Sequence, residues 1–149
     1  MGRPVAPGWI YWRNVLQIAT FDGLLEAMRE QAEPQRLLLV FTVAELPEGA
    51  SAEERARFEA GQGGALVPYV CVDKATDELA SFAAVLEESR AFDEAWAIVF
   101  AAALSGKGGK APTSGDADEP MERMVAAIRA GRLTGLVAFD RTGEAVSVG

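Results

Sequence analysis

The sequence predicts a single α/β domain with a mixed five-stranded sheet and about four helices. Two observations support this fold class: three apolar runs alternate with amphipathic helical patterns, and a β-hairpin pattern closes the chain. The alternative is an α+β fold in which residues 36–43 and 65–72 pair antiparallel. The connection between them, residues 44–64, is long enough for a parallel crossover or an antiparallel return, so the sequence leaves both pairings open.

The chain divides into a leader, residues 1–19, and one domain, residues 20–149. Proline and glycine interrupt the leader, so we expect it to be weakly ordered, or attached to the domain only through its aromatic side chains. The domain begins at Thr20, a good N-cap, which precedes apolar residues at helical spacing. A helix is therefore expected over residues 21–33, and Pro34 ends it.

Two strands and a short helix are expected next. Residues 36–43, RLLLVFTV, form a continuous β-rich apolar run of the kind typical of a strand buried on both faces. Ser51 and Glu54 make a capping-box pattern that opens a short polar helix through Ala60. Residues 65–72, ALVPYVCV, predict the second strand, and the proline within it indicates a sheet edge or an irregularity.

The second half of the chain continues the alternation. Apolar residues at helical spacing predict a helix over residues 75–90, and the run at 96–104 predicts a third strand. Residues 105–120 are too rich in glycine, proline and aspartate for regular structure, and Asp118 is expected to cap a fourth helix that Gly131 closes. GLVAFD and EAVSV, joined by RTG, predict the closing hairpin, whose glycine supplies the positive φ of the turn.

Composition excludes several kinds of chemistry and partner. The chain has no histidine and one cysteine, Cys71, which excludes histidine-based catalytic and zinc sites, a dithiol redox pair and an internal disulfide. Cys71 lies between two valines, so we expect a buried, inert thiol. The formal net charge of −8 repels a phosphate backbone, so no nucleic-acid partner is expected. The chain has neither a membrane-length apolar run nor a recognisable secretion signal, so we expect no membrane partner and a cytoplasmic location. We also expect no metal and no cofactor, because no sequence pattern for binding either is present.

One glycine-rich loop is the candidate for ligand binding. It reads LSGKGGKAPTS and follows the third apolar run, and its central residues are Lys107, Gly108, Gly109 and Lys110. Both phosphate-loop patterns break here, because Ala111 follows the second lysine and Pro112 stands where the variant pattern needs a lysine. If the strands are parallel, Asp73 and Lys74 converge on this loop and form a site for a small anionic or zwitterionic ligand. A flexible, solvated connection is the interpretation that we favour.

Three function classes remain. The first is a non-enzymatic binding or assembly module for a protein partner or a second copy, favoured by the missing catalytic residues and by apolar side chains such as Trp9 and Trp12. The second is a small anionic-ligand-binding domain that uses the loop at residues 105–114. The third is an enzyme using carboxylate, lysine or tyrosine chemistry, for which Tyr69 and Lys74 are the one pair near a strand end.

Three stretches of the domain carry a resemblance to known proteins. They are TFDGLLEAMRE, RLLLVFTVAELPEGASAEERARFEAGQGGALVPYVCVDKATDELA and ERMVAAIRAGRLTGLVAFDRTG. Together they resemble a group of small uncharacterised proteobacterial proteins often labelled "ribonucleotide reductase subunit alpha", and the resemblance covers nearly everything after Ala19. A reductase of that kind needs several cysteines on a much longer chain, so the resemblance implies no specific activity for a chain with one cysteine.

Overall fold

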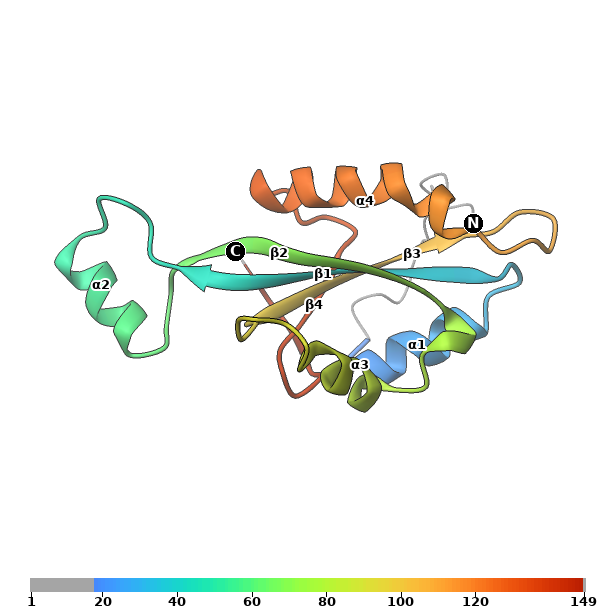
Figure 1. The fold of residues 1–149 in the computed structure, drawn as a ribbon, viewed down its shortest axis with the longest axis horizontal. Coiled ribbons are helices and arrows are strands. Elements are labelled where there is room, and N and C mark those ends of the chain that lie inside the picture. The colour runs from blue at the N-terminus through green and yellow to red at the C-terminus, as the bar shows by residue number, and fades with distance from the viewer. Residues whose placement is uncertain (1–17, 149) are drawn as a thin grey trace, which may run out of the picture.

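The computed structural model describes residues 18–148, and a five-stranded sheet forms the centre of this part of the chain (Figure 1). Most of the leader expected at residues 1–19 therefore lies outside the described residues. The elements follow one another as α1 Phe21–Arg29, β1 Gln35–Glu45, α2 Ala52–Glu59, β2 Ala65–Ala75, the 3-10 helix η2 Thr76–Glu78, α3 Phe82–Ser89, β3 Ile98–Ser105, α4 Ser114–Arg129, β4 Val137–Phe139 and β5 Ala145–Val146.

The sheet is antiparallel throughout. Its strand order is β2-β1-β3-β4-β5, and each neighbouring pair is antiparallel, which makes the fold α+β. The five strands and four α-helices are confirmed, and of the two pairings that the sequence left open the antiparallel one is observed. The parallel part of the mixed sheet is thus corrected. The reason is that residues 46–64 turn the chain back through a small exposed helix instead of carrying it across a sheet face.

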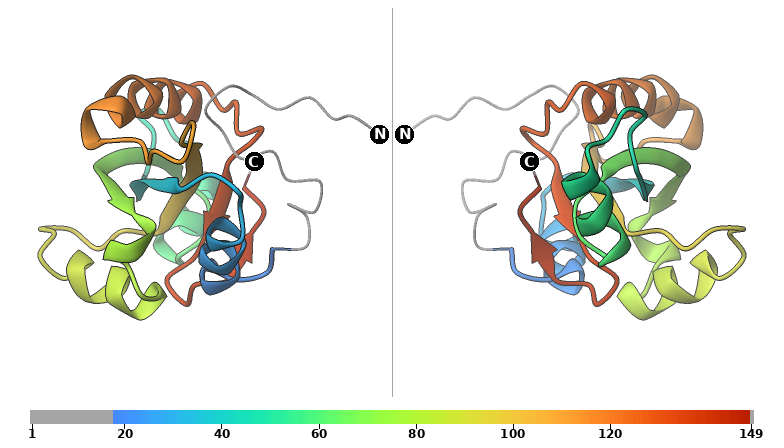
Figure 2. Two further views of the ribbon diagram at one scale, coloured as in Figure 1. Left: turned by 90° about the vertical axis from the view of Figure 1, so that its right-hand side faces the viewer. Right: turned by 90° about the vertical axis from the view of Figure 1, so that its left-hand side faces the viewer.

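Helices cover both faces of the sheet (Figures 1 and 2). Side chains alternate along β1, so Leu37 and Leu39 pack with α1 and α3, whereas Leu38 and Val40 pack with α4. Because β1 is central and both of its faces are covered, its apolar run is continuous, as the sequence predicted. β2 is an edge strand with a register shift beside Pro68, which confirms the irregularity expected there.

Two helices end or begin differently from the sequence prediction. α1 ends at Arg29, four residues before the expected end, and its guanidinium donates to the Leu79 carbonyl at 2.7 Å. The helix expected over residues 75–90 is instead η2 followed by α3. The backbone N–H of Phe82, at the start of α3, donates to Asp22 of α1 at 2.8 Å. A side chain sixty positions away therefore caps this helix, which no local pattern could indicate.

The fourth helix is longer than expected. It begins at Ser114, because Thr113 accepts a hydrogen bond from the Asp116 backbone and Asp116 accepts one from Thr113. Regular structure thus occupies part of the stretch at 105–120, and Asp118 is not the cap. Pro120 lies inside the helix with its ring buried, so the proline that suggested irregular chain forms part of the packing surface. The closing hairpin is confirmed, with Gly143 at φ 86° in its turn.

Candidate functional site

The residues predicted to form a ligand site do lie at one edge of the sheet, the edge formed by the strand ends, although the strands are antiparallel rather than parallel. β2 and β3 both run antiparallel to β1, which lies between them, so their C-terminal ends fall on the same edge. Arg36 of β1 accordingly pairs with Ala75 at the end of β2 and with Leu104 near the end of β3. Asp73, Lys74 and the glycine-rich loop therefore share this edge.

Asp73 and Lys74 do not form a joint site with the loop. They are neighbours on one strand, so their side chains point to opposite faces of the sheet. Asp73 accepts a hydrogen bond from Arg36 Nε at 2.6 Å, and Lys74 Nζ lies 2.9 Å from Glu88 of α3. Each of the two charges is thus paired with a side chain of a neighbouring element rather than held open for a ligand.

The glycine-rich loop is a tight turn rather than a flexible connection. Lys107 and Lys110 exchange backbone hydrogen bonds of 3.1 and 3.0 Å, and the two central glycines have φ values of 59° and 80°. Positive φ at both central positions is the geometry of a type I′ hairpin turn, which glycine adopts without strain. The flexible-connection interpretation is therefore corrected for these four residues.

The amides of this turn hold a carboxylate from elsewhere in the chain. Glu33, in the turn between α1 and β1, accepts from the Gly109 N–H at 2.7 Å and from the Gly108 N–H at 3.2 Å. Successive backbone N–H groups that converge in this way form an anion-binding concavity. Sequence reasoning did not find Glu33, because it lies 75 positions from Gly108 and only the pairing of β1 with β3 brings the two together.

A cleft of about 570 Å³ lies between this turn and the start of α4. Lys107, Lys110 and Arg123 contribute its basic side chains, and Arg123 is paired with Glu119 at 2.8 Å. Asp116 also lines the cleft, and its hydrogen bonds with the Thr113 backbone and side chain hold the pKa of its carboxyl below the usual value. The start of α4 is thus satisfied by the chain's own carboxylate, as the glycine turn is by Glu33.

The remaining candidate residues are also separated. Tyr69 Oη accepts a hydrogen bond from the Asp93 backbone at 3.1 Å, five positions along β2 from Lys74. Five strand residues span about 17 Å, so this tyrosine and lysine do not meet. Cys71 is exposed, which corrects the buried thiol predicted from its valine neighbours. It lies on an edge strand, and partial desolvation of the thiol raises its pKa.

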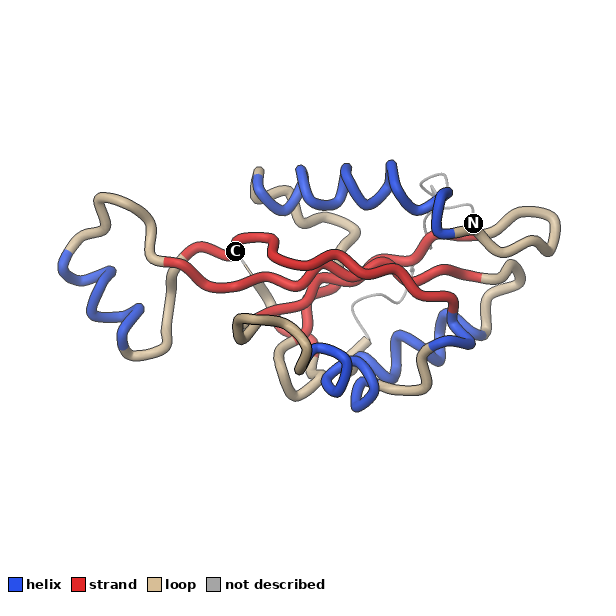
Figure 3. The backbone as a smooth tube through the Cα atoms, in the orientation of Figure 1, coloured by secondary structure: helices blue, strands red, loops and turns tan. Residues whose placement is uncertain are grey.

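A projecting arm, residues 46–64, extends beyond the sheet where β1 ends and β2 begins (Figure 3). α2 lies at its centre and has no buried residue. Ser51 and Glu54 close the predicted capping box, with hydrogen bonds of 2.8 and 3.1 Å. These reciprocal bonds also lower the pKa of the Glu54 carboxyl. The arm is therefore organised by its own end caps rather than by packing on the body.

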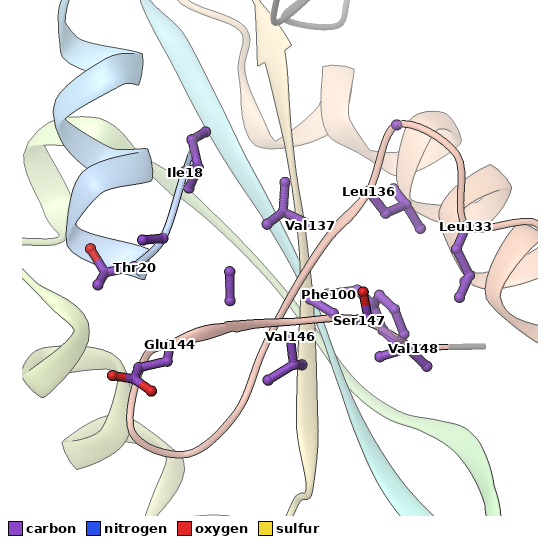
Figure 4. A pocket seen from close by; sticks show the side chains of 14 residues that line it. Ile18, Thr20, Phe100, Leu133, Leu136, Val137, Glu144, Val146, Ser147 and Val148 are labelled. Atoms are coloured by element: carbon purple, nitrogen blue, oxygen red, sulfur yellow. The ribbon is translucent and has the colours of Figure 1, made fainter. Parts of the chain in front are cut away.

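An apolar cleft of about 750 Å³ opens beside β5 (Figure 4). Phe100 and Val137 form part of its wall, and among residues 18–148 Glu144 is the one ionisable side chain that lines it. The lining side chains labelled in the figure come from the 18–20 segment, β3, the 133–137 segment and the C-terminal end. Such a surface is suited to contact with apolar side chains rather than to acid–base chemistry.

Comparisons with protein-family models, curated proteins and solved structures found no match to this chain. None of the helices within residues 18–148 is long and apolar enough to cross a membrane. In the same part of the chain, no three acidic or cysteine side chains gather as a metal site would require.

Proposed function

We propose that this protein is a non-enzymatic assembly module and that the arm at residues 46–64 contacts its partner. The observation that carries the proposal is α2, an ordered helix that buries no side chain against the body. Ordering each residue of such a segment costs about 1–2 kcal/mol of conformational entropy, which burial normally offsets. A contact outside the chain would supply that burial.

The surface of the arm indicates the character of this partner. Residues 46–64 contain four glutamates and two arginines, so both signs of charge are presented. Phe58 is the one half-buried side chain of α2, and it packs beside Gly64 at the base of the arm. A protein surface with complementary charges, on a second copy or another protein, fits these features better than a small metabolite. We place the protein in the cytoplasm, where a lone thiol such as Cys71 stays reduced.

The decisive experiment removes the arm without disturbing the sheet. Glu45 and Ala65 are directly paired across β1 and β2, so an Asn-Gly turn can replace residues 46–64. Light scattering then gives the mass of the intact and armless chains, beside a monomer mass of 15.8 kDa. We expect the intact chain to associate and the armless chain to be monomeric with an unchanged melting temperature.

A partner other than a second copy is tested by photocrosslinking from position 58 of the arm. In that case both chains are monomeric, and the intact chain crosslinks to one protein. That protein, once purified, binds the intact chain again but does not bind the armless chain. The proposal fails if association and binding are the same with and without the arm. Matched thermal-shift panels of nucleotides, phosphorylated metabolites and metals should remain flat for both chains.

One observation favours a second candidate function, the binding of a small anionic ligand at the glycine turn. The Gly108 and Gly109 amides already hold the Glu33 carboxylate, with exposed Lys107 and Lys110 on either side. A ligand carboxylate or phosphate would bind there by displacing Glu33. Replacing Glu33 with Gln should then strengthen the stabilisation by phosphate or acetate, and Lys107→Ala should weaken it. If phosphate and acetate leave the melting temperature of the unaltered chain and of both variants unchanged, this function is excluded.

A further inference from the structure

The apolar cleft beside β5 lies where, among the described elements, α4 packs less closely on the sheet than it does on β1 and β2. α4 packs on β2 and β1, whereas the same face of β3, β4 and β5 carries Phe100, Ala138 and Val146. Leu133 and Leu136, which follow α4, close one end of the cleft (Figure 4). Ile18 and Thr20 border the opposite side, and within the described chain Val137, Val146 and Val148 between them are only half-buried.

The described chain begins on the rim of this cleft. Ile18 and Thr20 line one side of it and Val146 lines another (Figure 4). The 19–20 segment is fastened to the hairpin: Ala145 N–H donates to the Ala19 carbonyl at 2.8 Å, and Thr20 forms a β-bridge with Glu144. The seventeen residues that precede Ile18 therefore enter from a fixed point at the edge of the apolar surface.

Those seventeen residues have the composition that the cleft requires. They contain Trp9, Ile10, Tyr11, Trp12, Val15 and Leu16. They also contain two arginines and no acidic residue, so their charge is +2, whereas the remainder carries −8 − (+2) = −10. Trp12 lies six positions from Ile18, a reach of about 20 Å in an extended chain. Apolar content, charge and reach thus all suit this segment to the cleft.

We propose that residues 1–17 of this same chain fill the cleft, with Trp9 and Trp12 against the half-buried Val137 and Val148 and with the leader arginines beside an acidic body. The tether at Ile18 makes the contact intramolecular, which gives the segment a high effective concentration at the cleft. The leader is then attached to the domain through its aromatic side chains, which is one of the two arrangements expected from the sequence. This inference is independent of the arm and of the assembly function proposed above.

The test uses the full chain and a chain that lacks residues 2–16. Removal of the segment should lower the melting temperature and increase the fluorescence of an apolar dye. The synthetic peptide 1–17, added in excess, should reverse both changes. Reversal by the peptide distinguishes a filled cleft from general damage by truncation. Equal melting temperatures and equal dye binding in the two chains would overturn the proposal.

A second measurement leaves the chain full-length. Leu133→Glu places a charge at the cleft, and Leu46→Glu makes the same change on the arm as a matched control. In the unaltered chain, acrylamide should quench the tryptophans weakly. Leu133→Glu should increase quenching and Leu46→Glu should not. Strong quenching in all three chains would refute the proposal. The proposal would also be refuted if the chain associates at higher protein concentration and dye binding falls as it associates, because a second copy would then occupy the cleft.

Discussion

α2 and α4 have the same local end structures and opposite roles in the fold. Each begins with a capping box, Ser51 with Glu54 in α2 and Thr113 with Asp116 in α4. Each ends at a glycine, and the backbone N–H after that glycine donates to the helix at 2.8 Å in α2 and 2.9 Å in α4. These bonds complete a Schellman motif at both helices. The ends of a helix can therefore be fixed entirely by its own sequence.

The difference lies between the caps. α4 buries Ala117, Pro120, Met124 and Ile128 against the sheet, whereas α2 buries nothing. The caps define where each helix starts and stops, and only the apolar stripe attaches it to the body. α4 thus contributes to global stability, whereas α2 is a local structure that buries no residue against the body.

The largest expected effect is loss of packing under α4. Ile128 is 6% exposed, and its replacement by alanine should lower the free energy of unfolding by about 2–5 kcal/mol. Chemical denaturation measures the change. The matched substitution in the arm, Phe58→Ala, should cost less than about 1 kcal/mol, because only its contact with the base of the arm is lost. The reverse ranking would mean that the arm, and not α4, holds the sheet.

A smaller effect separates the two capping boxes. Thr113→Ala removes the acceptor of the Asp116 N–H and should lower the free energy of global unfolding by about 1 kcal/mol. Ser51→Ala removes the equivalent bond in α2, yet it should leave the global transition in place and increase hydrogen exchange in the arm alone. Equal shifts of the global transition in both variants would show that the arm unfolds together with the sheet.

The acid dependence of stability should also differ between α4 and α2. Hydrogen bonds from Thr113 depress the pKa of Asp116 in the folded state, so its stabilising contribution is complete above the unfolded pKa, about 3.9. That contribution is lost as the pH falls through the lower folded pKa. The difference in unfolding free energy between the unaltered chain and Asp116→Asn should therefore shrink as the pH falls below about 4.

Glu54 of α2 is the control for this titration. Its pKa is also depressed, by hydrogen bonds from Ser51, but the helix it caps is not packed on the sheet. Glu54→Gln should accordingly leave the pH dependence of global unfolding unchanged. A change as large as that of Asp116→Asn would contradict the separation of the two helices.

The smallest expected effect on stability concerns Cys71, at the limit of the surface that α4 covers. A thiol reagent should label Cys71 in the native protein, because the residue is exposed. Partial desolvation raises the pKa of the thiol, so labelling near pH 7.5 should be slower than for a free cysteine and should accelerate with pH. Cys71→Ser should change the unfolding free energy by less than about 0.5 kcal/mol. Labelling that requires denaturant would extend the packing surface of α4 over this edge.

Features of the fold that depend on near neighbours in the chain could be predicted from the sequence. The apolar run of β1, the capping box at Ser51, the stripe of Met124 and Ile128 and the hairpin turn at Gly143 could all be predicted, because each involves residues a few positions apart. A hydrogen bond between a cap and the third residue of its helix needs no information from the remainder of the chain.

The choice of neighbouring strands, and of the distant residues that this choice brings into contact, depends on tertiary packing. The antiparallel pairing around β1, the cap that Asp22 supplies to α3 and the carboxylate of Glu33 on the glycine turn each join distant segments. The exposure of Cys71 follows from the position of β2 at the sheet edge, which its valine neighbours do not encode. Pairing is selected by the free energy of burying both sheet faces at once, which is a property of the whole packed chain rather than of any local pattern.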